Sequence, residues 1–138
     1  MYLLDTCVVS EIRKQRQANK GVKTFYKSVL AGEVPIYISV VTVGELRRGV
    51  ELIRHRGDSV QADRLEKWLE RIVNEYADHI LDFSLDEAQI WGRLRVPHHE
   101  NALDKQIAAT ALIYDLTLVT RNIADYTDTG VKLLNPFS

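Results

Sequence analysis

Cysteine, proline and long apolar runs are scarce in this 138-residue sequence, and each scarcity excludes a class of protein. The single cysteine, Cys7, rules out an internal disulfide framework and is compatible with a reducing compartment. Three prolines and no low-complexity tract argue against a disordered arm. No apolar stretch approaches the roughly 20 residues that span a bilayer, and the N-terminus lacks the basic start of a signal peptide. We therefore expect a cytoplasmic protein with no membrane partner.

Two phosphate-binding motifs are also missing. The sequence contains no Gly-x-Gly-x-x-Gly, which binds dinucleotides, and no Gly-x-x-x-x-Gly-Lys-Ser/Thr, which binds nucleoside triphosphates. Charge, in contrast, is present and unevenly distributed: residues 1–56 hold ten Lys/Arg and five Asp/Glu (+5), and residues 57–138 hold eight and fourteen (−6), which restores the total of −1. This asymmetry points to a polyanionic partner, although solvated helix faces alone can produce it.

Hydrophobic periodicity predicts strands that alternate with helices. Short apolar runs predict strands over residues 2–4, 35–39, 79–83, 117–120 and 131–134. Helical spacing and capping signals predict helices over residues 8–14, 20–30, 42–56, 58–76, 84–94 and 102–114. The capping signals include a capping box of Ser84 and Glu87 and an N-cap at Asn101. The alternation predicts an α/β fold with a parallel sheet covered by helices on both faces, and the length suits one domain over residues 1–138.

Four acidic residues occupy equivalent positions in this pattern. Asp5 ends the first strand, Glu45 and Asp104 lie in the first turns of predicted helices, and Asp125 follows the fourth strand. Each has a simpler explanation: Asp5 caps a helix, Glu45 forms a capping box with Thr42, Asp104 complements a helix dipole, or Asp125 lies in a solvated turn. Because strand tips and following helix starts share one edge of a parallel sheet, we expect all four acids to converge there.

Acids packed closely repel one another and raise one another's pKa unless a positive charge neutralises them. A hard divalent cation such as Mg²⁺ or Mn²⁺ is the natural partner, since it binds carboxylate oxygens and water. Such an ion activates water and stabilises charge on a phosphodiester. The hypothesis from the residues is therefore hydrolysis of a phosphodiester at an acidic metal site.

Four segments resemble the acidic motifs of the PIN-domain family, and most closely those of VapC/FitB-type toxins of type II toxin–antitoxin pairs. The segments are Leu3-Leu-Asp-Thr-Cys-Val-Val-Ser-Glu11, Thr42-Val-Gly-Glu-Leu-Arg-Arg-Gly49, Leu103-Asp-Lys-Gln-Ile-Ala-Ala-Thr-Ala111 and Leu118-Val-Thr-Arg-Asn-Ile-Ala-Asp-Tyr126. The resemblance covers essentially the whole chain. It implies a PIN-like three-layer sandwich with a parallel sheet of order 3-2-1-4-5.

The resemblance also implies an activity and its partners. It implies a Mg²⁺-dependent endoribonuclease, with Mn²⁺ as an alternative ion, inhibited by a cognate VapB/FitA-like antitoxin. A homodimer is expected, with DNA reached only through the antitoxin. The alternative is a weakly catalytic or non-catalytic PIN module that serves mainly as the antitoxin's partner in a DNA-bound autoregulatory complex.

Carried over by position, Asp5, Glu45, Asp104 and Asp125 are the expected catalytic and metal-binding residues. Some relatives place the fourth acid where this chain has Asn122, so Asn122 is interpreted as a polar neighbour of the site. Many relatives carry Asn where this chain has Cys7. This chain therefore lacks one hydrogen bond that the resemblance predicts near Asp5. The small hydroxyl positions beside the acids, candidates for holding metal-bound water or phosphate, are Thr6 and Thr120. Candidate contacts to the RNA backbone are Arg13, Lys14, Arg16, Arg47, Arg48 and Arg121, each of which is alternatively a solvated surface charge.

Overall fold

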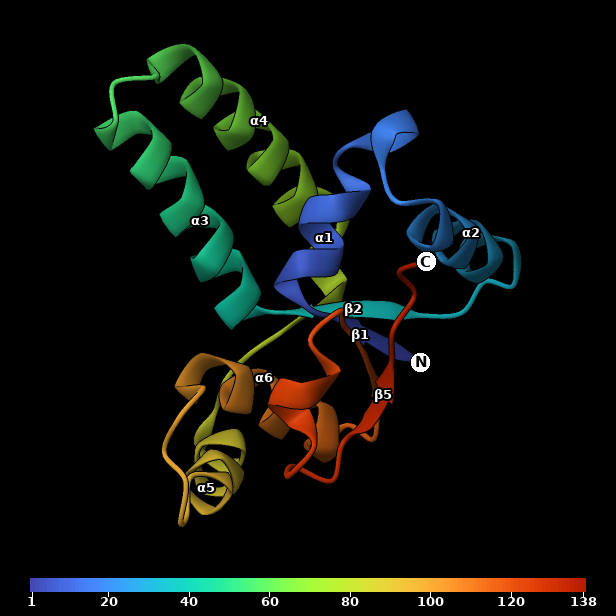
Figure 1. The fold of residues 1–138 in the computed structure, drawn as a ribbon, viewed down its shortest axis with the longest axis vertical. Helices are drawn as coiled ribbons and strands as arrows, with labels where there is room; N and C mark the ends of the chain where they lie inside the picture. The colour runs from blue at the N-terminus through green and yellow to red at the C-terminus, as the bar shows by residue number, and fades with distance from the viewer.

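The computed structural model describes residues 1–138 and is built on a five-stranded sheet of order β3-β2-β1-β4-β5 (Figure 1). All four neighbouring pairs are parallel, and the register places Leu3 of β1 beside Tyr37 of β2 and Leu118 of β4. The predicted fold class and strand order are therefore confirmed. The strands are β1 (Tyr2–Leu4), β2 (Ile36–Ser39), β3 (Ile80–Leu81), β4 (Thr117–Val119) and β5 (Lys132–Leu134).

Six α-helices and three short 3-10 helices connect the strands. Every predicted helix is present, with ends shifted by no more than two residues. None of the helices combines the length and apolar character needed to cross a lipid bilayer. The helices are α1 (Thr6–Ile12), η1 (Gln15–Gln17), α2 (Lys20–Ala31), α3 (Val40–His55), α4 (Ser59–Glu75), η2 (Ala77–His79), α5 (Leu85–Leu94), α6 (Ala102–Ile113) and η3 (Ile123–Tyr126).

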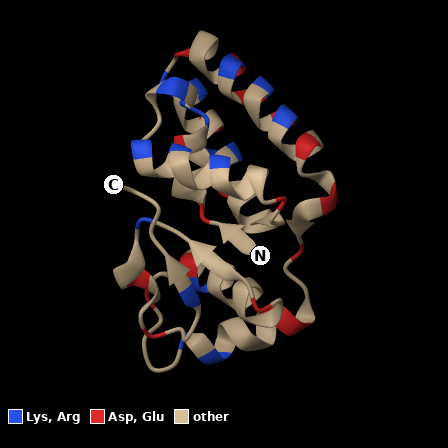
Figure 2. Cartoon of the chain, turned by 90° about the vertical axis from the view of Figure 1, so that its right-hand side faces the viewer, with Lys and Arg blue, Asp and Glu red and all other residues tan.

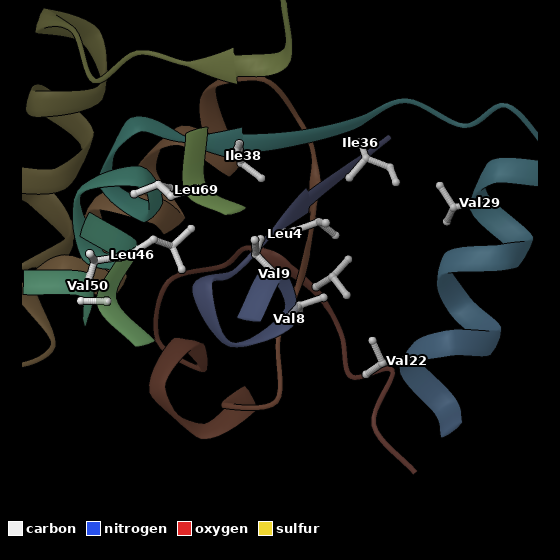
Figure 3. Packing of buried hydrophobic residues seen from close by; sticks show 12 residues of the cluster. Leu4, Val8, Val9, Val22, Val29, Ile36, Ile38, Leu46, Val50 and Leu69 are labelled. Carbon is white, nitrogen blue, oxygen red and sulfur yellow. The ribbon is translucent and has the colours of Figure 1, made fainter. Parts of the chain in front are cut away.

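The two faces of the sheet bury two separate apolar clusters, because successive strand residues point to opposite faces. Leu4 and Val119 belong to a cluster of 12 buried residues shared with α1, α2, α3 and α4 (Figure 3). Leu3 and Leu118 belong to a second cluster of eight buried residues, to which α6 contributes Ile107, Ala108 and Ala111. Helices therefore cover both faces, with α5 packed on the outside of α6 (Figure 1).

Helix starts in the structure correct one prediction and support another. The capping box of Thr42 and Glu45 is wrong: α3 begins two residues earlier, and Ser39 caps it by accepting the Val41 N–H at 3.0 Å. Glu45 therefore lies in the second turn of α3. The predicted capping box at the start of α5, formed by Ser84 and Glu87, is present. The N-cap position of α6 is Asn101, as predicted, but its side chain makes no capping hydrogen bond.

Candidate active site

Asp5 lies at the carboxyl end of the central strand and is almost completely buried, with 4% of its surface exposed. Its Oδ1 accepts the Thr6 N–H at 2.8 Å, so the predicted role as a helix cap is also real. Its Oδ2 accepts the hydroxyls of Thr120 at 2.7 Å and Tyr126 at 3.1 Å. A buried charge is costly unless it is hydrogen-bonded, and these three donors satisfy it.

Glu45 approaches Asp5 from α3 and is linked to it through Thr6. The Thr6 hydroxyl donates to Glu45 Oε1 at 2.9 Å and lies 3.2 Å from the hydroxyl of Thr42, which is fully buried. Burial raises the pKa of the Glu45 carboxyl, the Thr6 hydrogen bond opposes this, and the charge of Asp5 raises it further. The two acids are therefore electrostatically coupled.

Asp104 is the third acid and lies in the first turn of α6, as predicted. Its Oδ1 accepts the Tyr126 hydroxyl at 3.2 Å. Burial raises the pKa of Asp104 from 3.8 to about 6, with the charge of Asp5 the next cause and those of Asp125 and Glu45 adding smaller effects. A shift of this size is typical of carboxylates gathered at functional sites.

Asp125 lies at the rim, not within this network. Its side chain is exposed on η3 and forms no hydrogen bond, although its charge contributes to the raised pKa of Asp104. Asn122 is also exposed, and only its backbone N–H reaches the site, donating to the Thr120 hydroxyl at 3.0 Å. The structure thus links Asp5 with Glu45 and Asp104 and leaves the other two side chains outside.

The donor set fits a hard divalent cation in its chemistry. The three linked acids offer only oxygen atoms, and none of them forms an ion pair with Lys or Arg. No group of three or more His, Cys, Asp or Glu side chains is arranged closely enough to hold a metal ion as it stands. Binding would therefore require at least one of the carboxylates to move toward the others.

Cys7 lies beside this network. Its Sγ is 4.0 Å from Asp5 Oδ2 and 3.8 Å from the Thr120 hydroxyl. Burial is the main cause of a raised pKa of the Cys7 thiol. A thiol held protonated is a poor nucleophile, so Cys7 packs against the site and does not supply a thiolate.

Most of the candidate RNA-binding cations are already engaged by other groups. Lys14 pairs with Glu11 at 2.9 Å and Arg47 with Glu66 at 2.6 Å. Two guanidinium groups stack on aromatic rings: Arg13 over Trp68 at 5.8 Å, and Arg121 over Phe137 at 3.9 Å. Arg16 and Arg48 are exposed and form no ion pair.

Two residues of the network escaped the sequence analysis. Thr42 precedes Glu45 by three positions, a spacing that fits a capping box and equally places both side chains on one helix face. Tyr126 stands at the end of the fourth motif, and an aromatic residue there predicts core packing. Only the three-dimensional structure reveals that its hydroxyl reaches two acids, Asp5 after β1 and Asp104 at the start of α6.

Residues 2–126 match the family described as PIN domain. The chain belongs to this family. It is 35% identical over 143 residues to Toxin FitB from Neisseria gonorrhoeae, with 99% of each chain covered. It is 26% identical over 143 residues to VapC ribonuclease Y4jK from Sinorhizobium fredii, with 99% of this chain and 98% of the relative covered.

Solved structures support the same assignment. The crystal structure of FitAcB from Neisseria gonorrhoeae has a TM-score of 0.83 and 34% identity, with 99% of this chain and 98% of the other covered. A structure of FitAB bound to an IR36 DNA fragment has a TM-score of 0.79 and 32% identity, with coverage of 100% and 96%. The resemblance found in the sequence is confirmed.

Proposed function

We propose that this chain, as one PIN domain over residues 1–138, is a divalent-metal-dependent endoribonuclease and the toxin of a toxin–antitoxin pair. The observation that carries the proposal is the linked set of Asp5, Glu45 and Asp104 at the carboxyl edge of the sheet. Two relatives support it: one is named as a toxin and the other as a ribonuclease, and this chain aligns with nearly the whole length of each.

In this proposal Asp5, Glu45 and Asp104 hold a Mg²⁺ or Mn²⁺ ion, with Asp125 as a fourth acid at the rim. When bound, such an ion activates water and stabilises charge on the phosphodiester. Thr6 holds the Glu45 carboxylate, and Thr120 holds Asp5, so the ligands are oriented by neutral donors. With a pKa of about 6, Asp104 is mainly ionised at pH 7.5 and available as a ligand.

The test is cleavage of a labelled RNA by purified protein with Mg²⁺ and with EDTA. We expect cleavage only with the metal and its loss in Asp5→Asn. Asp128→Asn is the matched control, because Asp128 is an exposed acid with no hydrogen bond or ion pair, and it should cleave like wild type. Metal-independent cleavage, or equal cleavage by Asp5→Asn, would contradict the proposal.

An apolar groove of about 710 Å³ between α1, α2 and α4 supports an antitoxin partner. Its floor includes Val22, Leu65 and Trp68, and its lining also contains cations that form no ion pair: Arg13, Arg16, Lys23, Lys27, Arg64 and Arg71. Figure 2 shows Lys and Arg positions gathered over this part of the molecule. An apolar floor with basic surroundings is complementary to an acidic, amphipathic segment, which we propose the antitoxin supplies.

Charge reversal tests this docking. We expect Arg71→Glu to weaken binding of the protein encoded by the adjacent short reading frame. Lys67→Glu is the control, because Lys67 is an exposed cation on the same helix but outside the groove. If Arg71→Glu left partner binding unchanged and lowered RNA affinity in an Asp5→Asn background, the groove would be an RNA site instead.

Exposed apolar side chains on and around α5 and α6 support a homodimer. Five large ones lie there, at 39–77% exposure: Leu85, Val96, Leu103, Ile113 and Tyr114. We propose that these residues form one apolar surface, of the kind that marks an interaction site. Light scattering after size exclusion should give twice the 15.8 kDa chain mass, and Leu85→Asp together with Leu103→Asp should give the monomer.

The second candidate function is a binding module in a DNA-bound complex, favoured by the likeness to FitAB on a DNA fragment. Metal titration separates the two functions. Millimolar Mn²⁺ or Mg²⁺ should bind if the chain is a nuclease. Absence of binding at that concentration would favour the second candidate.

A further inference from the structure

Tyr126 is the one side chain that contacts both Asp5 and Asp104. Its hydroxyl lies 3.1 Å from Asp5 Oδ2 and 3.2 Å from Asp104 Oδ1. The tyrosine itself is 1% exposed, so no solvent competes strongly for the hydroxyl. The two acids lie 99 positions apart in the sequence (104 minus 5), and the Tyr126 hydroxyl bridges them.

The carboxylate oxygens that Tyr126 does not contact accept fewer hydrogen bonds and can still bind a ligand. Asp5 Oδ1 accepts only the Thr6 N–H, whereas Asp5 Oδ2 accepts both Thr120 and Tyr126. Asp104 Oδ2 accepts no hydrogen bond. Each carboxylate therefore has one oxygen in contact with the phenol, whose single proton is shared between the two, and one oxygen left for a ligand.

We infer that Tyr126 is a positioning residue that fixes Asp5 and Asp104 for cation binding by holding one oxygen of each. The inference rests on the proposed function, because it assigns a role toward the same ion. It goes beyond that proposal in naming a residue that is not itself a ligand. Hydrogen-bond partners of ligating groups orient them, and their loss typically lowers metal affinity by about 10- to 100-fold.

The surroundings of Tyr126 suit this role because they fix the ring. The ring packs in the apolar cluster formed with Leu3 and Ile107. The Tyr126 carbonyl accepts the hydroxyl of buried Thr129 at 2.6 Å, which anchors the end of η3. A side chain held in this way has little rotamer freedom to lose when it donates, so its hydroxyl is preorganised.

The test is Mn²⁺ affinity, measured by electron paramagnetic resonance on metal-free protein without RNA. We expect Tyr126→Phe, which keeps the ring and removes the hydroxyl, to bind Mn²⁺ about tenfold more weakly than wild type. Tyr76→Phe is the matched control, because it removes a part-buried hydroxyl that contacts Tyr26 at 3.3 Å and no acid. Its Mn²⁺ affinity should equal that of wild type, and thermal unfolding in EDTA checks that both variants fold.

Two results would overturn the inference while leaving the proposed function intact. Unchanged affinity in Tyr126→Phe would reduce Tyr126 to a core residue. Tighter binding would mean that the phenol competes with the ion for the carboxylates. If the wild-type protein bound no Mn²⁺, that result would contradict the proposed function. The role of Tyr126 toward the ion would then be contradicted as well.

Discussion

The raised pKa of Asp104 makes a prediction about stability that is independent of catalysis. Burial and neighbouring acids raise this pKa from 3.8 to about 6, so the folded protein holds the proton more tightly than the unfolded chain does. Without metal, the contribution of Asp104 to stability is fully present below pH 3.8 and is lost as the pH rises through 6. Asp104→Asn removes the charge and should therefore stabilise the metal-free protein at neutral pH.

The magnitude follows from the size of the shift. A shift of about two pKa units corresponds to about 3 kcal/mol. Asp104 is only partly buried, so solvent screening reduces the figure to about 1 kcal/mol. For a chain of this length that free energy corresponds to a rise in Tm of about 3 °C. An Asn oxygen can still accept the Tyr126 hydrogen bond, so the substitution mainly removes charge.

Urea unfolding in EDTA at pH 4 and pH 7.5 measures this effect. The difference in unfolding free energy between Asp104→Asn and wild type should be near zero at pH 4 and about +1 kcal/mol at pH 7.5. Asp128→Asn, at an exposed acid without polar contacts, should show no such rise. A zero or negative difference for Asp104→Asn at pH 7.5 would contradict the combined destabilisation of the Asp104 carboxylate by burial and by the neighbouring acids.

Three further substitutions test the framework around the site. Leu118→Ala, at a fully buried position of β4, should cost about 2–5 kcal/mol in urea unfolding, and a cost below about 1 kcal/mol would contradict the packing. Gly21→Ala should lower the Tm, because an added Cβ would lie 2.2 Å from the Pro136 carbonyl oxygen; an unchanged Tm would refute that close approach. Thr6→Val should lower Mg²⁺-dependent RNA cleavage at least about tenfold by releasing Glu45, with wild-type cleavage as the contrary outcome.

The residue pattern was sufficient to predict a parallel sheet with alternating strands and helices, and the family resemblance supplied the strand order that the structure shows. Asp5 was predictable because a short apolar run stops there, and an α/β sheet collects ligands at strand tips. The start of α3 was not predictable in the same way. Thr42 and Glu45 have the spacing of a capping box, but Ser39, three residues before Thr42, is an equally good cap. Local signals could not rank the two caps. In the structure Thr42 is buried and its hydroxyl lies 3.2 Å from that of Thr6, a contact across 36 residues that no local signal shows.

The same limit explains why the hydroxyl network was not predicted. Thr120 and Tyr126 reach Asp5 across 115 and 121 residues, and neither residue type in isolation indicates a partner. For Asp125 the sequence pattern predicts membership of the acidic set, but pattern cannot distinguish a buried position from the exposed one on η3 that the structure shows. Distances within the site are tertiary properties, and residue spacing alone does not determine them.

The three linked acids are held by hydroxyl groups and not by cations, and this choice has an electrostatic consequence. Hydroxyls orient a carboxylate without neutralising it, so the negative charge of Asp5, Glu45 and Asp104 remains uncompensated within the protein. Lys105, the neighbour of Asp104, donates instead to the His98 carbonyl. If a lysine paired with these acids, a metal ion would have to displace it before binding. Because none does, an entering cation would offset both the burial and the repulsion between the acids that raise the pKa of Asp104, and part of its binding free energy would come from that effect.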